Sequence, residues 1–180
     1  MGWLMFHVWV AEVIEFITST TRAYPYWALP LAFAIAFMES FVGLSFLVPG
    51  FLLLVTLGGV LGATHASLLP AWAGAVCGAV LGDWISWWIG CRYHHQILHF
   101  PWFRRFEGQI EGALHFFHRW GAWGVFLGRF LGPFRATVPL VAGMAELEFM
   151  PFMLANIASA LIWATLLLAP GAEIVRHAFQ

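Results

Sequence analysis

Two arginines, Arg129 and Arg135, lie in the strongly apolar stretch between Gly128 and Gly143. A charged side chain inside a membrane is costly, so such residues usually line a cavity, pair with an opposite charge or take part in function. The guanidinium group stays charged away from water, and its planar set of N–H donors matches the oxygen atoms of a phosphate or a carboxylate. The pair therefore predicts a binding site for an anion.

Two acidic residues, Glu39 and Asp83, lie in other apolar parts of the chain. The two acids and the two arginines carry no net charge together, so they can form one buried cluster. A carboxyl group removed from water holds a proton more readily, and we expect Glu39, with Asp83 as the alternative, to gate the site or couple it to protons. A purely structural role is less attractive, because burying an ion pair often costs as much as the attraction returns.

The elements that must position these charges are membrane helices. Hydrophobic residues make up 62% of the chain, charged residues 9%, and the mean hydropathy is +0.83. A soluble domain has about 45–50% apolar and about 25% charged residues. No charged side chain occurs between Glu39 and Asp83, or from Phe149 to Ala172, and each run exceeds the roughly 20 residues that span a bilayer. The sequence predicts an all-α, multispanning membrane protein.

The apolar blocks divide the chain into two units. Residues 1–22 predict an amphipathic helix at the membrane surface, with a first spanning helix as the alternative, and residues 23–180 a single membrane domain. That domain consists of a first half over residues 23–93, a connector with an amphipathic helix over 94–120, and a second half over 121–175.

Each half contains an apolar segment interrupted by proline and glycine. Residues 26–62 are too long for one span and short for two, which predicts a re-entrant hairpin, and residues 121–143 are broken in the same way. A spanning helix follows each segment, over residues 67–90 and 149–169. Interrupted segments at matching places in two halves are typical of a transport site near the middle of the membrane. The residues expected to break the hairpins are Pro49, Gly50, Pro133, Pro139 and Gly143.

The middle span carries small residues at every fourth position: Gly74, Gly78, Gly82, Ser86 and Gly90. Such a row lets another helix backbone approach closely in a membrane. A parallel row of alanines, Ala71, Ala75 and Ala79, leads directly to Asp83. We therefore expect Asp83 to face the packed interior and not lipid.

Three motifs in the chain resemble the DedA family, whose members are also described as carrying the SNARE-associated or VTT domain. The motifs are Glu39-Ser-Phe-x-Gly…Pro49-Gly50, Gly82-Asp83-Trp-Ile-Ser-x-Trp-x-Gly90-x-Arg92, and Arg129-Phe-x-Gly-Pro133-x-Arg135-x-x-x-Pro139-x-x-Ala142-Gly143. The third is long and specific, whereas the first alone is weak. The resemblance covers residues 27–169 and is greatest to bacterial inner-membrane members.

This resemblance implies two re-entrant hairpins that enter from opposite membrane faces. It also implies transport of a phosphate-bearing lipid, notably undecaprenyl phosphate, with functional residues at Glu39, Arg129 and Arg135. Some members carry an acid directly after the Pro-Gly of the first hairpin, where this chain has Phe51. This chain therefore lacks the second hairpin acid of a two-acid proton-coupling scheme, which leaves Glu39 as the main candidate and Asp83 as the alternative.

We accordingly expect a lipid flippase in the bacterial inner membrane, with no enzymatic activity, cofactor or metal. The alternatives are an enzyme that modifies a lipid phosphate and a structural scaffold held by ion pairs. The eight histidines lack the acidic or cysteine partners that complete an obvious metal site. The expected partners are a polyprenyl phosphate or phospholipid and protons, and a homo-oligomer is compatible with the sequence. The arginines are too few and scattered for a nucleic-acid surface.

Overall fold

A computed structural model describes residues 2–45, 49–99 and 107–178. Within these residues the regular structure is entirely helical. The elements are α1 (Gly2–Ala23), η1 (Pro25–Trp27), α2 (Ala28–Ser40), α3 (Gly50–Ala63), α4 (Leu69–His99), α6 (Glu107–Trp120), α7 (Ala122–Gly128), η2 (Gly132–Ala136), α8 (Thr137–Met144) and α9 (Phe149–Ala178).

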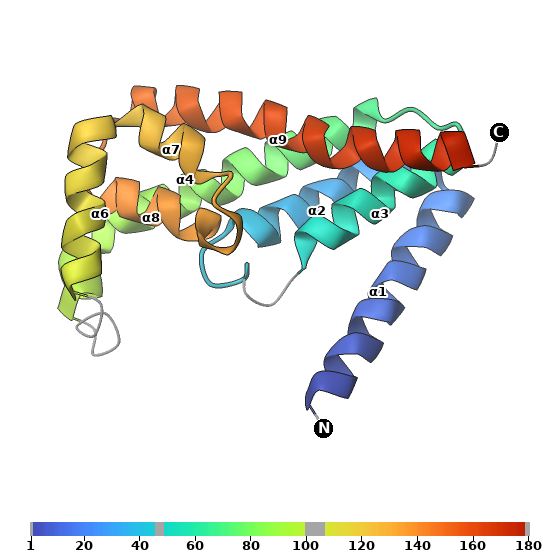
Figure 1. Ribbon diagram of the computed structural model, residues 1–180, viewed down its shortest axis with the longest axis horizontal. Coiled ribbons are helices and arrows are strands. Elements are labelled where there is room, and N and C mark those ends of the chain that lie inside the picture. Colours follow the sequence, from blue (N-terminus) through green and yellow to red (C-terminus); the bar gives the residue numbers. More distant parts are fainter. Residues whose placement is uncertain (1, 46–48, 100–106, 179–180) are drawn as a thin grey trace.

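Two long helices, α4 and α9, run along the molecule, and two pairs of shorter helices lie against them (Figure 1). The α2/α3 pair occupies one end and the α7/α8 pair the other, so that the described residues of the two interruptions meet near the middle, where Ser45 shares a cavity with Gly132 and Arg135. In the first pair α2 packs on α4 and α3 on α9, whereas in the second pair α7 packs on α9 and α8 on α4. The contacts therefore keep their pattern when the two halves are exchanged.

Glycine permits these close contacts between helices. A Cβ atom added at Gly74 or Gly78 would collide with backbone atoms of α2, and one at Gly90 with backbone atoms of α8. Gly58 and Gly62 of α3 approach the α9 backbone in the same way. The predicted small-residue row on the middle helix is confirmed as a packing surface. Its N-terminal part packs against α2 of the first half, and its C-terminal part packs against α8 of the second half.

The apolar core has two main parts, one at each end of the molecule. The first gathers α1, α2, α3, the start of α4 and the later part of α9 around Leu54, Leu57 and Leu61. The second gathers α6, α7, α8 and the start of α9 around Phe117 and Phe152. Asp83 lies between these two cores, since Val80 before it on α4 packs against the first core and Trp87 after it packs against the second.

The N-terminal helix α1 contacts the rest of the molecule through its C-terminal half. Ile17 and Thr21 are almost fully buried there, and α3 is the helix that α1 packs against most extensively. The other end of α1 projects away from the body (Figure 1). Its place at a membrane surface stays a prediction.

Several boundaries differ from the sequence prediction. Helix α4 continues past residue 90 to His99, because no glycine or proline interrupts the chain there. Pro139 and Gly143 were expected to break the second hairpin, and this is wrong, since both lie inside α8. Pro139 occupies the first turn of α8, where its missing N–H has no intrahelical partner to lose. Gly143 instead allows α8 to approach the backbone of α4.

One helix in the described part of the chain is long and apolar enough to cross a bilayer. It covers Phe149–Glu173 within α9 and has a mean hydropathy of 2.0. Gly50–Ala63 is apolar but shorter. Of the two predicted spanning helices, the last therefore meets the length and hydropathy criteria, whereas α4 does not.

Candidate functional site

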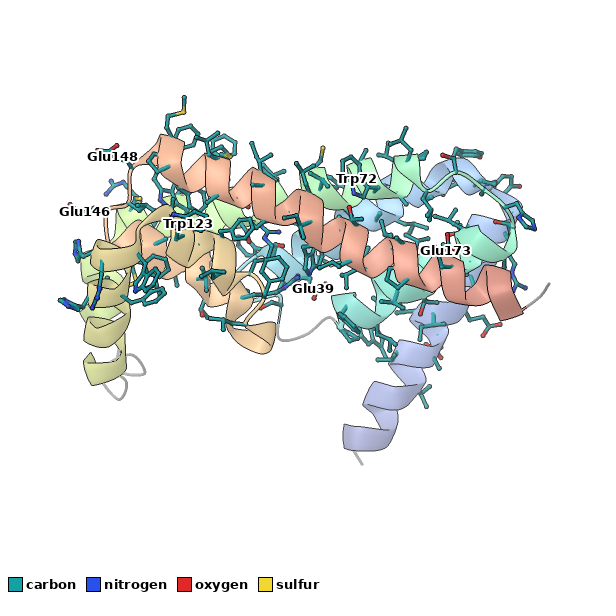
Figure 2. The ribbon with its side chains drawn as sticks, turned by 45° about the horizontal axis from the view of Figure 1, so that its top comes forward. Glu39, Trp72, Trp123, Glu146, Glu148 and Glu173 are labelled. Carbon is teal, nitrogen blue, oxygen red and sulfur yellow. The ribbon has the colours of Figure 1, made fainter. Side chains whose placement is uncertain are left out.

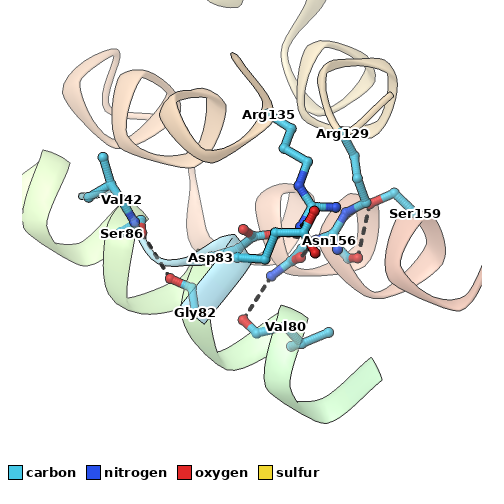
Figure 3. A network of polar contacts seen from close by, with 10 residues as sticks. Val42, Val80, Gly82, Asp83, Ser86, Arg129, Arg135, Asn156 and Ser159 are labelled. Atoms are coloured by element: carbon cyan, nitrogen blue, oxygen red, sulfur yellow. Dashed lines mark hydrogen bonds and ion pairs between the residues drawn. The ribbon is translucent and has the colours of Figure 1, made fainter. Parts of the chain in front are cut away.

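Arg129 lies at the C-terminal end of α7 and is 5% exposed. Its Nη2 atom donates to the Asp83 carboxylate on α4 and to the amide oxygen of Asn156 on α9 (Figure 3). Asn156 in turn donates its amide N–H to the carbonyl oxygen of Val80, at 3.1 Å. Residues of both long helices thus bind the guanidinium group at the end of α7.

Arg135 lies in η2 and forms an ion pair with Glu39, the residue before the last of α2. Its Nη2 atom is 3.0 Å from Glu39 Oε1, but the geometry of this contact is not that of a hydrogen bond. The guanidinium carbon lies 4.2 Å from the centroid of the Trp163 ring, and that of Arg129 lies 6.0 Å from the same ring. One buried indole therefore faces both arginines, an arrangement that stabilises cations near an aromatic ring.

Glu39 also faces the beginning of α3. The backbone N–H of Phe51, in the first turn of α3, faces the Glu39 carboxylate. A Cβ atom at Gly50 would collide with that carboxylate, so only glycine lets the helix begin this close to it. The unpaired N–H groups at a helix N-terminus favour a negative charge, so the Pro49-Gly50 break presents a favourable end to Glu39.

These residues surround a cavity of about 520 Å³ at the meeting point of the two helix pairs. Figure 2 shows Glu39 in this central part of the molecule. The lining residues are Glu39, Ser45, Phe51, Arg129, Phe130, Gly132, Arg135, Trp163, Leu166 and Leu167. Asp83 is not among the residues that line the cavity, and its carboxylate instead contacts Arg129, which does line it.

Unpartnered polar atoms gather at this cavity. Among the described residues, buried side-chain atoms without a hydrogen-bond partner occur on Thr21, Glu39, Ser45, Arg129 and Arg135. All of these except Thr21 line the cavity. Buried polar groups normally have hydrogen-bond partners, because leaving one unpaired costs roughly 1–3 kcal/mol. The cavity therefore concentrates donors without hydrogen-bond partners, including Arg129 Nη1 and Arg135 Nη2, although Arg135 Nη2 is also in the ion pair with Glu39.

The structure brings the four predicted charges together and decides how they pair. Glu39 and Arg129 occupy matching places in the two halves, each at the end of the first helix of its pair. They do not pair with each other, since Glu39 pairs with Arg135 and Arg129 with Asp83. Pro49 lies directly before α3, and Pro133 lies in η2, so both mark the interruptions of the helix pairs.

Sequence reasoning did not identify Trp163 or Ser45 as part of the site. A signal for Trp163 was present, because Asn156, Ser159 and Trp163 follow one another at helical spacing on one face of α9. All three are buried. Ser45 lies outside the helices, in the interruption of the first pair, where helical periodicity does not predict which way a side chain faces. No group of three metal-ligating side chains occurs among the residues that the structure describes.

The sequence is similar to a family model and to several bacterial membrane proteins. A family model described as the VTT domain matches residues 48–173. The chain is 31% identical to "Inner membrane protein YabI" of Escherichia coli over 157 residues, which is 87% of this chain and 60% of that protein. It is also 31% identical to an "Uncharacterized membrane protein" of Buchnera aphidicola over 137 residues, 76% of this chain and 54% of that one.

A membrane protein of Synechocystis is 28% identical over 173 residues, which is 92% of this chain and 72% of that protein. The chain spans about three fifths of the length of the Escherichia coli relative and about half of the Buchnera one. No solved structure matches the chain.

Proposed function

The chain belongs to the VTT domain, or DedA, family of membrane proteins, and on this premise we propose that it moves a phosphate-bearing lipid across the bacterial inner membrane. The lipid that the family resemblance favours is undecaprenyl phosphate. In this proposal Arg129 and Arg135 bind the phosphate in the central cavity, while the hydrocarbon chain stays in the apolar part of the membrane.

The observation that carries the proposal is the set of unpartnered donors around the cavity. Arg129 Nη1 and Arg135 Nη2 are buried, line the same cavity and lack hydrogen-bond partners. A phosphate group supplies several acceptor oxygens and negative charge, which would satisfy both guanidinium groups at once. The Glu39 carboxylate competes with the phosphate for Arg135, since Glu39 and Arg135 form an ion pair in this structure.

The depth of the cavity supports transport across the membrane. The span-length segment of α9 runs over Phe149–Glu173, and the cavity residues Trp163, Leu166 and Leu167 lie just past its midpoint. The interrupted segments of the two helix pairs meet at the same level (Figure 1). We infer that the pairs are re-entrant hairpins and that the cavity is reached from either side as they move.

The different contacts of Asp83 and Glu39 suggest different roles for the two acids. Asp83 is bound to Arg129 and does not line the cavity. Glu39 lines the cavity and keeps one oxygen without a partner. We therefore assign gating and proton coupling to Glu39, and the positioning of Arg129 to Asp83.

A lipid-flipping assay in proteoliposomes tests the proposal. Arg135→Gln removes a charge that faces the cavity, and we expect it to abolish movement of undecaprenyl phosphate. Arg119→Gln is the matched control, because Arg119 is an exposed arginine of α6, and we expect it to transport at the parental rate. Correctly folded Arg135→Gln and Arg129→Gln proteins that both transport at the parental rate would contradict the proposal.

The same assay separates the alternative functions. Release of inorganic phosphate from the lipid would favour an enzyme, for which Ser45 is the hydroxyl among the cavity-lining residues. Absence of both movement and hydrolysis in the parental protein would favour a scaffold.

A further inference from the structure

A second cavity lies beside the charged one, and its walls are apolar. It forms a groove of about 480 Å³ between α7 and α9, lined by Ala122, Trp123, Phe126, Pro151, Leu154, Ala155 and Ala158. Building on the proposed function, we propose that this groove holds the hydrocarbon chain of the lipid whose phosphate binds at the arginines.

The α7 wall leads from the groove to the charged cavity. Trp123 and Phe126 line or border the groove, and their ring centroids are 6.0 Å apart. Phe126 is in turn 6.0 Å from Phe130, which lines the charged cavity. Trp123 and Phe130 are well exposed, and Phe126 between them is partly exposed, so this aromatic ridge is open to the surroundings at both ends.

The α9 wall leads to the same place. Leu154, Ala158, Ile162 and Leu166 follow one another at intervals of four, which puts them on one face of the helix. Leu154 and Ala158 line the groove, and Leu166 lines the charged cavity. All four are exposed, so no other part of the described chain covers this face.

The dimensions fit a lipid chain. The twelve positions from Leu154 to Leu166 correspond to about 18 Å of helix. One leaflet of the hydrocarbon core is about 15 Å thick, half of the roughly 30 Å core. Because the charged cavity lies near the midpoint of the span, a chain that starts at the arginines and follows this track ends near one surface of the membrane. The occupant is therefore an amphiphile with an anionic head and a long apolar chain.

Photolabelling tests this inference with a long-chain alkyl phosphate that carries a diazirine on its chain. In the full-length protein in lipid nanodiscs, we expect labelling of residues 122–126 and 151–158. Excess unlabelled alkyl phosphate should suppress this labelling, whereas the alkyl alcohol of equal length should not, because it lacks the group that the arginines bind.

Variants that fill the groove sharpen the test. Ala158→Trp should remove the phosphate-competable labelling, since Ala158 is an exposed residue of the groove floor. Ala122→Phe fills the groove from the α7 side and covers the case in which Ala158→Trp does not fold. Ile157→Trp is the matched control, because Ile157 is exposed on α9 but does not line the groove.

Stabilisation by inorganic phosphate, measured as a shift in the unfolding temperature, distinguishes this inference from the proposed function. If phosphate stabilises the protein but the labelling is equally suppressed by the alcohol, the groove contacts only bulk lipid and the inference is wrong. Crosslinking of two copies of the chain through these residues would also overturn it. If neither phosphate nor alkyl phosphate binds the parental protein, the anion site itself is wrong, and the groove assignment falls with it.

Discussion

At the scale of single residues, the site depends on how two like charges are kept close together. Arg129 is held by Asp83 and Asn156, whereas Arg135 has Glu39 on one side and the Trp163 ring on the other. An aromatic ring attracts the face of a guanidinium and leaves its edge N–H groups available. We therefore expect Trp163 to position the two cavity-lining arginines while leaving their edge N–H groups free for an anion.

Substitution of Trp163 tests this role. We expect Trp163→Leu to weaken phosphate binding by about tenfold, the size of a desolvated cation–π interaction of roughly 1–2 kcal/mol. Trp163→Phe keeps a ring and should recover much of the affinity. Titration of inorganic phosphate against the unfolding temperature measures both. Equal affinities in two variants of similar stability would show that Trp163 only fills space.

Glu39 is the residue through which protons are expected to act. Glu39→Gln keeps the size of the side chain but cannot carry a charge, so transport in this variant should not respond to an imposed proton gradient. The check is lipid movement in proteoliposomes with and without a pH difference across the membrane. A gradient response equal to that of the parental protein would exclude Glu39 as the proton carrier. The corresponding Asp83→Asn variant then identifies the remaining acid.

At the scale of helices, small residues determine how close the shorter helices come to the two long ones. Gly78 of α4 faces the backbone of α2, and Gly143 of α8 faces the backbone of α4. Association of helices in a membrane depends on such packing, because lipid removes the hydrophobic driving force that acts in water. The same contacts hold Glu39 and Arg135 at their places, since each lies near the end of a helix packed in this way.

Gly78→Ala should therefore destabilise the protein by about 1–3 kcal/mol, because the added methyl group meets the Phe33 carbonyl and backbone must shift. Gly112→Ala in α6 is the matched control, since nothing lies within 4 Å of its added Cβ. There alanine should stabilise the helix by up to about 1 kcal/mol. Unfolding in detergent compares the two, and an equal effect at both positions would contradict close packing at Gly78.

At the scale of the whole molecule, both ion pairs join the first half of the chain to the second. Asp83 and Glu39 belong to the first half, and Arg129 and Arg135 to the second. They lie between two apolar cores that each contain part of α9. The chain thus has a polar layer at the boundary between two well-packed ends, which is where movement of the helix pairs against each other would open the cavity.

Removing one partner should be worse than replacing both. Asp83→Ala leaves Arg129 buried and unpaired and should cost about 3–5 kcal/mol. Asp83→Leu combined with Arg129→Met replaces the pair by apolar side chains and should recover most of that stability. Lipid transport should remain lost in the double variant, because the guanidinium is gone. A double variant as unstable as Asp83→Ala would show that the pair itself is needed for folding.

Local sequence determined much of this protein. Composition gave the membrane class, glycine spacing gave the packing surface of α4, and the alanine row predicted that Asp83 faces the interior, where it is 6% exposed. Pro49 and Pro133 marked two real interruptions, whereas Pro139 and Gly143 did not, because proline is tolerated in a first helical turn and glycine at a helix contact.

What only the tertiary structure decided is which groups meet. Glu39 pairs with Arg135 and Asp83 with Arg129, and Trp163 faces both arginines, although these residues are far apart in the chain. Periodicity determines the face of a helix on which a residue lies. The residue that it contacts across the helix interface depends on tertiary packing, in which α4 contacts α2 and α8, and α9 contacts α3 and α7. The charged cavity forms where residues of the two interruptions, Ser45 and Arg135 among them, meet beside α9, and the adjoining groove forms where α7 packs on α9.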